Sequence, residues 1–132
     1  MSLLLSLVTR HALGIVISEQ EYDFLGNAHG PDVSFFEPDK VALMDPDKRV
    51  QRFVPDLAIE IASRSDTYES LVKKKNRYRQ AGTQEVWLIS LESREVAIFS
   101  PGLTRELPGE DQLSTSLIPG FSIRVNELFS ES

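Results

Sequence analysis

Short apolar runs with period two, separated by turn residues, recur along the chain and predict β-strands. We expect strands at residues 13–17, 21–24, 32–36, 54–62, 85–90 and 94–100. Near the end of the chain, Phe121, Ile123 and Val125 alternate with polar residues and are expected to point inward before a short turn. The predicted fold class is therefore α/β, with a mixed and mostly β-rich sheet.

Two segments carry helical patterns. Residues 2–12 are predicted to form an N-terminal helix. A second helix follows strand 54–62, capped at its start by Ser65 or Asp66 and ended by Gly82 in the left-handed conformation. Because this helix joins two strands, it predicts a βαβ unit with parallel strands and a right-handed crossover.

Two connecting segments lack either period. The stretch "GNAHGP" is typical of a turn. Residues 37–53 are rich in Pro, Asp and Lys, and we expect a surface loop there.

Composition narrows the class of protein. A chain of 132 residues, 41% hydrophobic and 26% charged, suits a single domain over residues 1–132. The absence of cysteine excludes disulfides and thiolate metal sites and is typical of the reducing cytoplasm. The apolar start lacks the features of a signal peptide and is too short to span a bilayer, so no membrane association is expected.

A net charge of −6 argues against non-specific binding of nucleic acid, which needs a basic surface. It leaves room for a locally basic groove. The segment "VKKKNRYR", residues 72–79, is the one cluster that could form it.

A carboxylate in the middle of a buried strand is the strongest chemical signal. Glu60 lies between Ile59 and Ile61, and its neighbours at period two are alanines, so both faces of the strand are predicted to be buried. An unpaired buried carboxylate costs several kcal/mol, so a polar or metallic partner should lie beside it. Asp56 points to the same face but lies about 13 Å away along a strand, too far to share one metal ion.

Asp32 is the better partner, because it follows a proline at the start of a different strand. If the two strands are adjacent, Asp32 and Glu60 could together bind Mg²⁺ or Mn²⁺. The alternative for Asp32 alone is an ordinary turn or strand-start residue.

The second helix adds a cation near this pair. Its predicted inward stripe consists of Tyr68, Leu71, Tyr78 and Ala81. Lys74 and Lys75 flank the stripe, whereas Lys73 points away. One of the two could reach Glu60, but the spacing does not choose between them, and lysines beside an apolar stripe commonly extend to solvent. Two acids, a lysine and a divalent metal ion suit phosphodiester hydrolysis.

The remaining candidates carry less weight. His11 and His29 are interpreted as surface or loop residues, and Ser63 as a helix-capping group. Trp87 is expected in the core or at an interface. No glycine-rich phosphate-binding loop is present, which argues against nucleoside triphosphates.

Four segments, "GPDVSFF", "VPDLAIEIAS", "LVKKKNRYRQAGTQEVWLIS" and "IPGFSIRVNELF", resemble in order and character the Uma-type family of restriction endonucleases in the PD-(D/E)XK nuclease superfamily. The resemblance covers residues from about 13 to 129. It implies a restriction-endonuclease-like fold, a divalent metal ion and a cytoplasmic protein of bacterial type. By position, Asp32 is the motif's first aspartate and Glu60 its second acid.

The motif's lysine departs from the usual spacing, because Ala62 stands two residues after Glu60. The family's pattern instead takes this lysine from the following helix, four residues before an aromatic. Here that position is Lys74, four before Tyr78.

A second departure lies at the N-terminus. Family members usually carry a longer N-terminal segment with a further active-site acid, whereas the first acid here is Glu19. Three alternatives stay open: a truncated protein, replacement by Glu19 or Glu21, or a member that folds without cutting.

The sequence thus predicts a Mg²⁺-dependent endonuclease acting on DNA, with Asp32 and Glu60 as metal ligands and Lys74 orienting water or stabilising charge. The alternative is a catalytically silent domain of the same fold that mediates protein interaction or self-association; the acidic pI of about 4.9 favours it. The resemblance also implies a homodimer. The edge around Trp87, Ile98 and Phe99 is its predicted interface.

Overall fold

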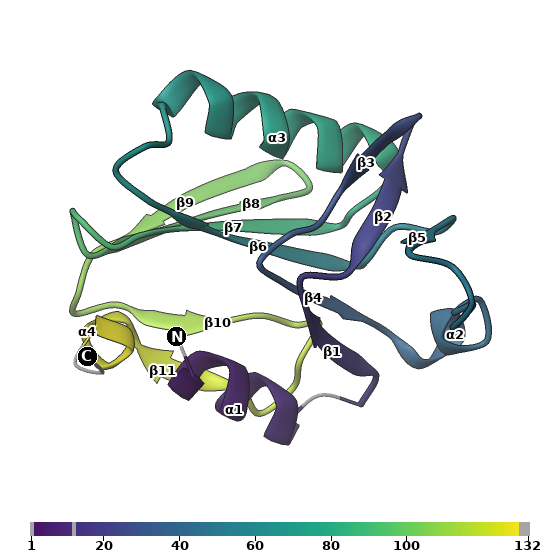
Figure 1. The fold of residues 1–132 in the computed structure, drawn as a ribbon. Coiled ribbons are helices and arrows are strands. Elements are labelled where there is room, and N and C mark those ends of the chain that lie inside the picture. Colours follow the sequence, from purple (N-terminus) through teal and green to yellow (C-terminus); the bar gives the residue numbers. More distant parts are fainter. Residues whose placement is uncertain (1, 12, 130–132) are drawn as a thin grey trace.

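A mixed six-stranded β-sheet organises the fold in the computed structural model, which describes residues 2–11 and 13–129 (Figure 1). In spatial order its strands are β1 (Ile15–Ser18), β4 (Val33–Phe36), β6 (Leu57–Ala62), β7 (Glu85–Ser90), β8 (Glu95–Ser100) and β9 (Leu103–Leu107). The pair β6 and β7 is parallel, and the other neighbours are antiparallel. The predicted α/β class and the parallel crossover are confirmed; β9 was not predicted.

Helix α3 (Tyr68–Ala81) makes the crossover from β6 to β7 and covers one face of the sheet (Figure 1). Thr67 caps its start by accepting a hydrogen bond from the backbone N–H of Ser70 at 3.0 Å, so the predicted cap at Ser65 or Asp66 is wrong by one or two residues. Asp66 instead closes the preceding turn. Gly82 ends the helix as predicted, with a φ of 114° that disfavours residues with a Cβ atom.

A small second sheet packs beside α3. It contains β2 (Glu21–Phe24), β3 (Asn27–His29) and β5 (Val50–Gln51), with β2 in the centre. The predicted turn therefore contains a strand, and the predicted loop 37–53 contains α2 (Pro38–Val41) as well as β5. These elements were missed because each is short and depends on pairing or packing with distant residues.

The opposite face of the main sheet is covered by α1 (Ser2–His11), β10 (Gln112–Ser114), β11 (Ser122–Arg124) and α4 (Val125–Phe129) (Figure 1). The predicted first helix is confirmed up to His11, and residue 12 lies outside the described residues. Phe121, Ile123 and Val125 are buried as predicted, although Val125 begins α4 rather than ending a strand. Within the described residues, no helix has the length and apolarity needed to cross a membrane.

Two hydrophobic clusters lie on the two faces of the sheet, because alternate residues of each strand point to opposite sides. On β6, Leu57 and Ile59 belong to the larger cluster, whereas Ala58 belongs to the cluster under α3. Glu60 shares the α3 side with Ala58, as the period-two pattern predicts.

The predicted dimer surface is wrong. Trp87 and Ile98 are both fully buried in the larger cluster, and the Trp87 ring stacks on Phe121 with 6.0 Å between centroids. The Trp87 indole N–H also donates to Glu85 at 2.7 Å. Fully burying one large apolar side chain contributes about 1.5–3 kcal/mol, so these residues stabilise the fold and cannot form an interface without unfolding part of it.

Candidate functional site

Glu60 lies beneath α3 with two partners supplied by that helix. The residue is 5% exposed, and the Tyr78 hydroxyl donates a hydrogen bond of 2.6 Å to Oε1. The Lys74 ammonium lies 3.8 Å from the other carboxylate oxygen, Oε2. Because β6 leads directly into the crossover helix, the chain returns over its own buried acid and places a donor and a cation beside it.

The electrostatic balance at Glu60 opposes the charged form. Burial raises the pKa of Glu60, and the nearby negative charges of Asp32 and Asp66 raise it further. The hydrogen bond from Tyr78 and the charge of Lys74 lower it, but they do not compensate fully. Burial and the Glu60 charge raise the pKa of Tyr78, so its hydroxyl keeps its proton and remains a donor.

Asp32 approaches Glu60 from the neighbouring strand. Strands β4 and β6 are antiparallel, with Val33 opposite Ile59. Continuing this register by one residue puts Asp32 opposite Glu60 on the α3 side of the sheet. Asp32 Oδ2 accepts the backbone N–H of Ile61 at 2.7 Å, which fixes its carboxylate against β6.

The donor set of Asp32 and Glu60 fits a divalent cation. Hard cations such as Mg²⁺ and Mn²⁺ prefer carboxylate oxygens. Here two carboxylates on adjacent strands repel each other, and one of them is desolvated. A bound cation would remove both penalties, which is a reason for the pair to be present in the fold.

The three consecutive lysines of α3 have different environments. Lys74 approaches Glu60, and Lys75 lies over the Phe99 ring at 4.6 Å from its centroid. Lys73 points away, as predicted, and lies 3.7 Å from Glu69 on the exposed side. The predicted inward direction of Tyr68 is wrong, because this side chain is 83% exposed. Tyr68 is the first residue of α3, and the helix begins beyond the end of β6.

His29 and Arg77 form a pair that sequence reasoning missed. His29 belongs to β3, is half-buried, and lies with Nε2 2.6 Å from Nη1 of Arg77. Its ring also makes an edge contact with Tyr78. Burial lowers the pKa of His29, and the charges of Arg77 and Lys74 lower it further. His29, predicted to be a surface or loop residue, is half-buried and lies in a strand. The side chain of His11 lies outside the described part.

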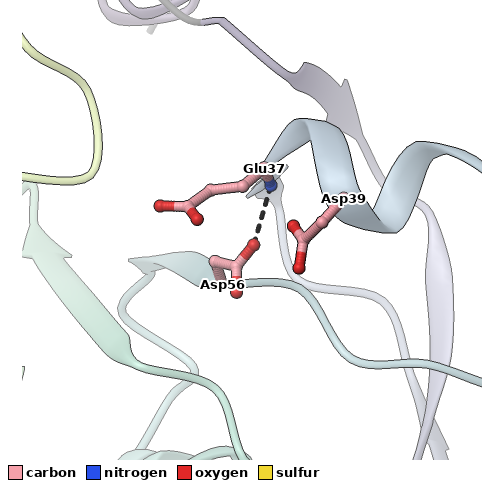
Figure 2. Close-up of side chains that lie close together, drawn as sticks. All are labelled: Glu37, Asp39 and Asp56. Atoms are coloured by element: carbon pink, nitrogen blue, oxygen red, sulfur yellow. Dashed lines mark hydrogen bonds between the residues drawn. The ribbon is translucent and has the colours of Figure 1, made fainter.

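A second acidic group lies at the other end of β6. Among the described residues, Glu37, Asp39 and Asp56 are the only three potential ligands whose oxygens lie within 4.8 Å of one another (Figure 2). Asp56 is nevertheless already satisfied: it accepts the backbone N–H of Glu37 at 2.7 Å, and the Lys40 ammonium lies 2.9 Å from its other oxygen. Gln84 donates a further hydrogen bond to it.

Lys40 thus already supplies the positive charge that a cation would bring to this second group. The cluster carries no independent sign of a ligand. We interpret it as a structural joint between β4, β6 and α2.

The acids near the N-terminus make different contacts. Glu21 forms an ion pair with Arg49. Glu19 has an exposed side chain and a φ of 57°, and its backbone N–H donates to the carbonyl of Asp32 at 3.2 Å. Glu19 is therefore the acid whose backbone lies beside the site.

A cleft of about 760 Å³ adjoins the site beyond the end of β6. Ala62 and Asp66 line it next to Glu60, together with Tyr68 and Leu71 at the start of α3. Its remaining lining residues are Ser63, Arg64, Leu88, Ser90, Leu91, Glu92, Ser93, Glu95, Val96, Ala97 and Glu106. The four acids outnumber the single arginine, so the cleft is acidic.

A mixed α/β sheet, with a crossover helix between two parallel central strands, gives the chain a nuclease-like fold. Residues 1–126 match the model of the Uma2 family, described as "Putative restriction endonuclease", and the chain belongs to this family. No curated protein matches the sequence.

Among solved structures, the chain is similar to a crystal structure described as "a putative nuclease belonging to DUF820" from Anabaena variabilis. The TM-score is 0.87 at 20% sequence identity, and the match covers 98% of this chain and 77% of the other. The likeness supports the nuclease-like fold and, at this identity, no further property.

Proposed function

We propose that this protein is a metal-dependent endonuclease that hydrolyses phosphodiester bonds in DNA, with Asp32 and Glu60 holding Mg²⁺ or Mn²⁺. The observation that carries the proposal is the buried Glu60 carboxylate, which lies opposite Asp32 and 3.8 Å from Lys74. Family membership supplies the class of reaction.

Each residue has a role that its position allows. Glu60 offers Oε2, because Oε1 is taken by Tyr78. Asp32 offers the oxygen that does not accept the Ile61 N–H. A divalent ion held by these oxygens would polarise the phosphate and acidify a water molecule. Lys74, half-exposed beside Glu60, would orient a water molecule or stabilise developing negative charge.

The test is cleavage of duplex and single-stranded DNA with Mg²⁺, with Mn²⁺ and with chelator, comparing Lys74→Ala with Lys73→Ala. Both variants remove one charge from the same helix, but only Lys74 approaches Glu60. We expect metal-dependent cleavage that falls about a hundredfold or more in Lys74→Ala and changes little in Lys73→Ala. Equal effects of the two variants would contradict the role of Lys74.

A catalytically silent domain that mediates protein interaction remains the second candidate. The acidic cleft favours it, because carboxylates beside the site repel nucleic acid and suit a basic protein partner. Absence of cleavage from a folded protein, with either metal ion and with DNA or RNA, would favour this candidate over the endonuclease.

We also propose a homodimer located in the cytoplasm. Two-fold pairing would present one active site to each strand of a duplex, and the absence of cysteine suits a reducing compartment. The burial of Trp87 and Ile98 requires another interface. Light scattering across micromolar concentrations tests the assembly, and a single-chain mass throughout would contradict it.

A further inference from the structure

Arg77 carries a positive charge that the described part of the protein leaves without a carboxylate. Among the described residues, four other basic side chains form ion pairs with carboxylates: Lys40 with Asp56, Arg49 with Glu21, Lys73 with Glu69, and Lys74 with Glu60. Among residues 2–11 and 13–129, no carboxylate oxygen lies within 4.0 Å of the Arg77 guanidinium.

His29 holds Arg77 without neutralising it. The Nη1 to Nε2 distance is 2.6 Å, and an N–H of the guanidinium can donate only to a ring nitrogen that carries no proton. The imidazole is therefore neutral, with its proton on Nδ1, in agreement with its lowered pKa. This bond uses one of the five N–H donors of Arg77 and leaves its charge intact.

The pair lies on the same side of α3 as the candidate site. Arg77 follows Lys74 by three residues, about 4.5 Å along the helix axis, and such residues lie on one face. It also precedes Tyr78, whose hydroxyl binds Glu60. Along the helix axis, Arg77 therefore lies between Lys74 and Tyr78, the two residues of α3 that contact Glu60.

The charge distribution gives the site two unlike sides. Towards the start of α3 lies the acidic cleft with Asp66 and, on the β8 and β9 side, Glu95 and Glu106. Towards the end of α3 lies Arg77 with its neutral partner. An anionic strand that reaches Glu60 is repelled by the first side and attracted by the second.

We propose that Arg77, positioned by His29, is a phosphate-binding subsite that takes a backbone phosphate adjacent to the one at the metal site. A planar guanidinium with free donors matches the oxygens of a phosphate diester. This inference rests on the proposed function in its choice of ligand, a nucleic-acid backbone. The guanidinium and imidazole themselves require no metal ion.

The experiment measures binding of a fluorescently labelled DNA duplex with Ca²⁺ in place of Mg²⁺, as a function of salt. Arg77→Met removes the charge and keeps the length of the side chain, and Lys73→Met is the matched control on the exposed side of α3. We expect Arg77→Met to weaken binding about tenfold and to reduce the slope of log affinity against log salt by about 1, with little change in the control.

A second variant and a second measurement separate this role from folding and from the proposed function. Arg77→Lys keeps the positive charge but loses the planar guanidinium with its paired N–H donors. It should therefore keep the dependence of DNA affinity on salt and bind DNA with intermediate affinity. The rise in melting temperature with Mn²⁺ should persist in Arg77→Met, because Asp32 and Glu60 are unchanged.

Equal affinities and salt slopes for wild type and a folded Arg77→Met would overturn the subsite, as would equal losses in Lys73→Met. DNA binding that depends on Arg77 without any Mn²⁺ response or cleavage would support the subsite and count against the endonuclease. Metal-dependent cleavage that is unchanged in Arg77→Met would support the endonuclease and count against the subsite.

Discussion

Replacing Tyr78 by Phe removes one hydroxyl from the most buried hydrogen bond of the candidate site. Tyr78 is 1% exposed, and its hydroxyl donates to Glu60 Oε1 at 2.6 Å. The ring keeps its contact with Phe24, at 4.4 Å between centroids, so the change leaves packing nearly intact. The loss of stability in Tyr78→Phe should therefore come from the hydrogen bond to the Glu60 carboxylate alone.

The magnitude depends on the charge of Glu60 and hence on pH. A hydrogen bond to a charged group contributes about 1.5–3 kcal/mol, and one between neutral groups about 0.5–1.5 kcal/mol. Glu60 has a raised pKa, so its contribution to stability is full below the unfolded value and is lost as pH rises through the folded pKa. The Tyr78 bond lowers that pKa, so Tyr78→Phe should raise it further.

The destabilisation by Tyr78→Phe should therefore grow with pH, by about 1 kcal/mol between the two limits. Urea unfolding at several values from about pH 5.5 to about pH 8.5 measures it, since a loss of about 2 kcal/mol moves the midpoint by about 1 M. Tyr22→Phe is the control: its buried hydroxyl lies 2.6 Å from the neutral Ser34 hydroxyl, so its cost should not vary with pH.

Combining Tyr78→Phe with Glu60→Gln should remove the pH dependence of its cost, because no carboxylate remains beneath the ring. A destabilisation by Tyr78→Phe that is equal at both ends of the pH range, or that matches Tyr22→Phe throughout, would refute the assignment of Tyr78 as the donor to a titrating Glu60.

Three further predictions follow from the same contacts. Asp32→Asn should abolish the rise in melting temperature with Mn²⁺ and raise metal-free stability by relieving carboxylate repulsion, as thermal melts with and without Mn²⁺ would measure; an unchanged shift would place the metal ion elsewhere. Lys75→Ala should reduce cleavage far less than Lys74→Ala and should mainly make DNA binding weaker and more sensitive to salt. In urea unfolding near pH 8 without metal, Glu60→Gln should stabilise the fold because it removes a buried charge whose pKa is raised. Asp56→Asn should destabilise it by about 2–4 kcal/mol because it leaves a lysine unpaired, and the same sign for both would contradict the distinction between the two acids.

The parts of the fold that local chemistry determines were predictable. A continuous apolar run, interrupted only by Glu60, defines β6, and Gly82 ends α3 because a left-handed residue is needed there. Two strands joined by one helix then leave a parallel crossover as the expected arrangement. The buried position of Glu60 followed from its neighbours.

The parts that depend on distant partners were not predictable. Strand β9 carries few apolar residues and is a strand because it pairs with β8. His29 and Arg77 are 48 residues apart, and nothing local indicates that a hairpin will fold over that turn of α3. A helical wheel shows which residues of α3 share a face with Tyr68. It does not show where the sheet under that face ends, so it cannot show that Tyr68 is exposed.

The acid–lysine pairs at Asp56 and Glu60 differ in how fully each carboxylate is neutralised and hydrogen-bonded. Asp56 lies 2.9 Å from a lysine and also accepts hydrogen bonds from a backbone N–H and an amide, so its donors leave little room for another ligand. Glu60 lies 3.8 Å from Lys74, which is 36% exposed, and its pKa remains raised. A carboxylate selected only for stability would be expected to resemble the first. The second pairs a buried acid with a cation 3.8 Å away, and this uncompensated cost supports the proposal that Glu60 binds a further ligand.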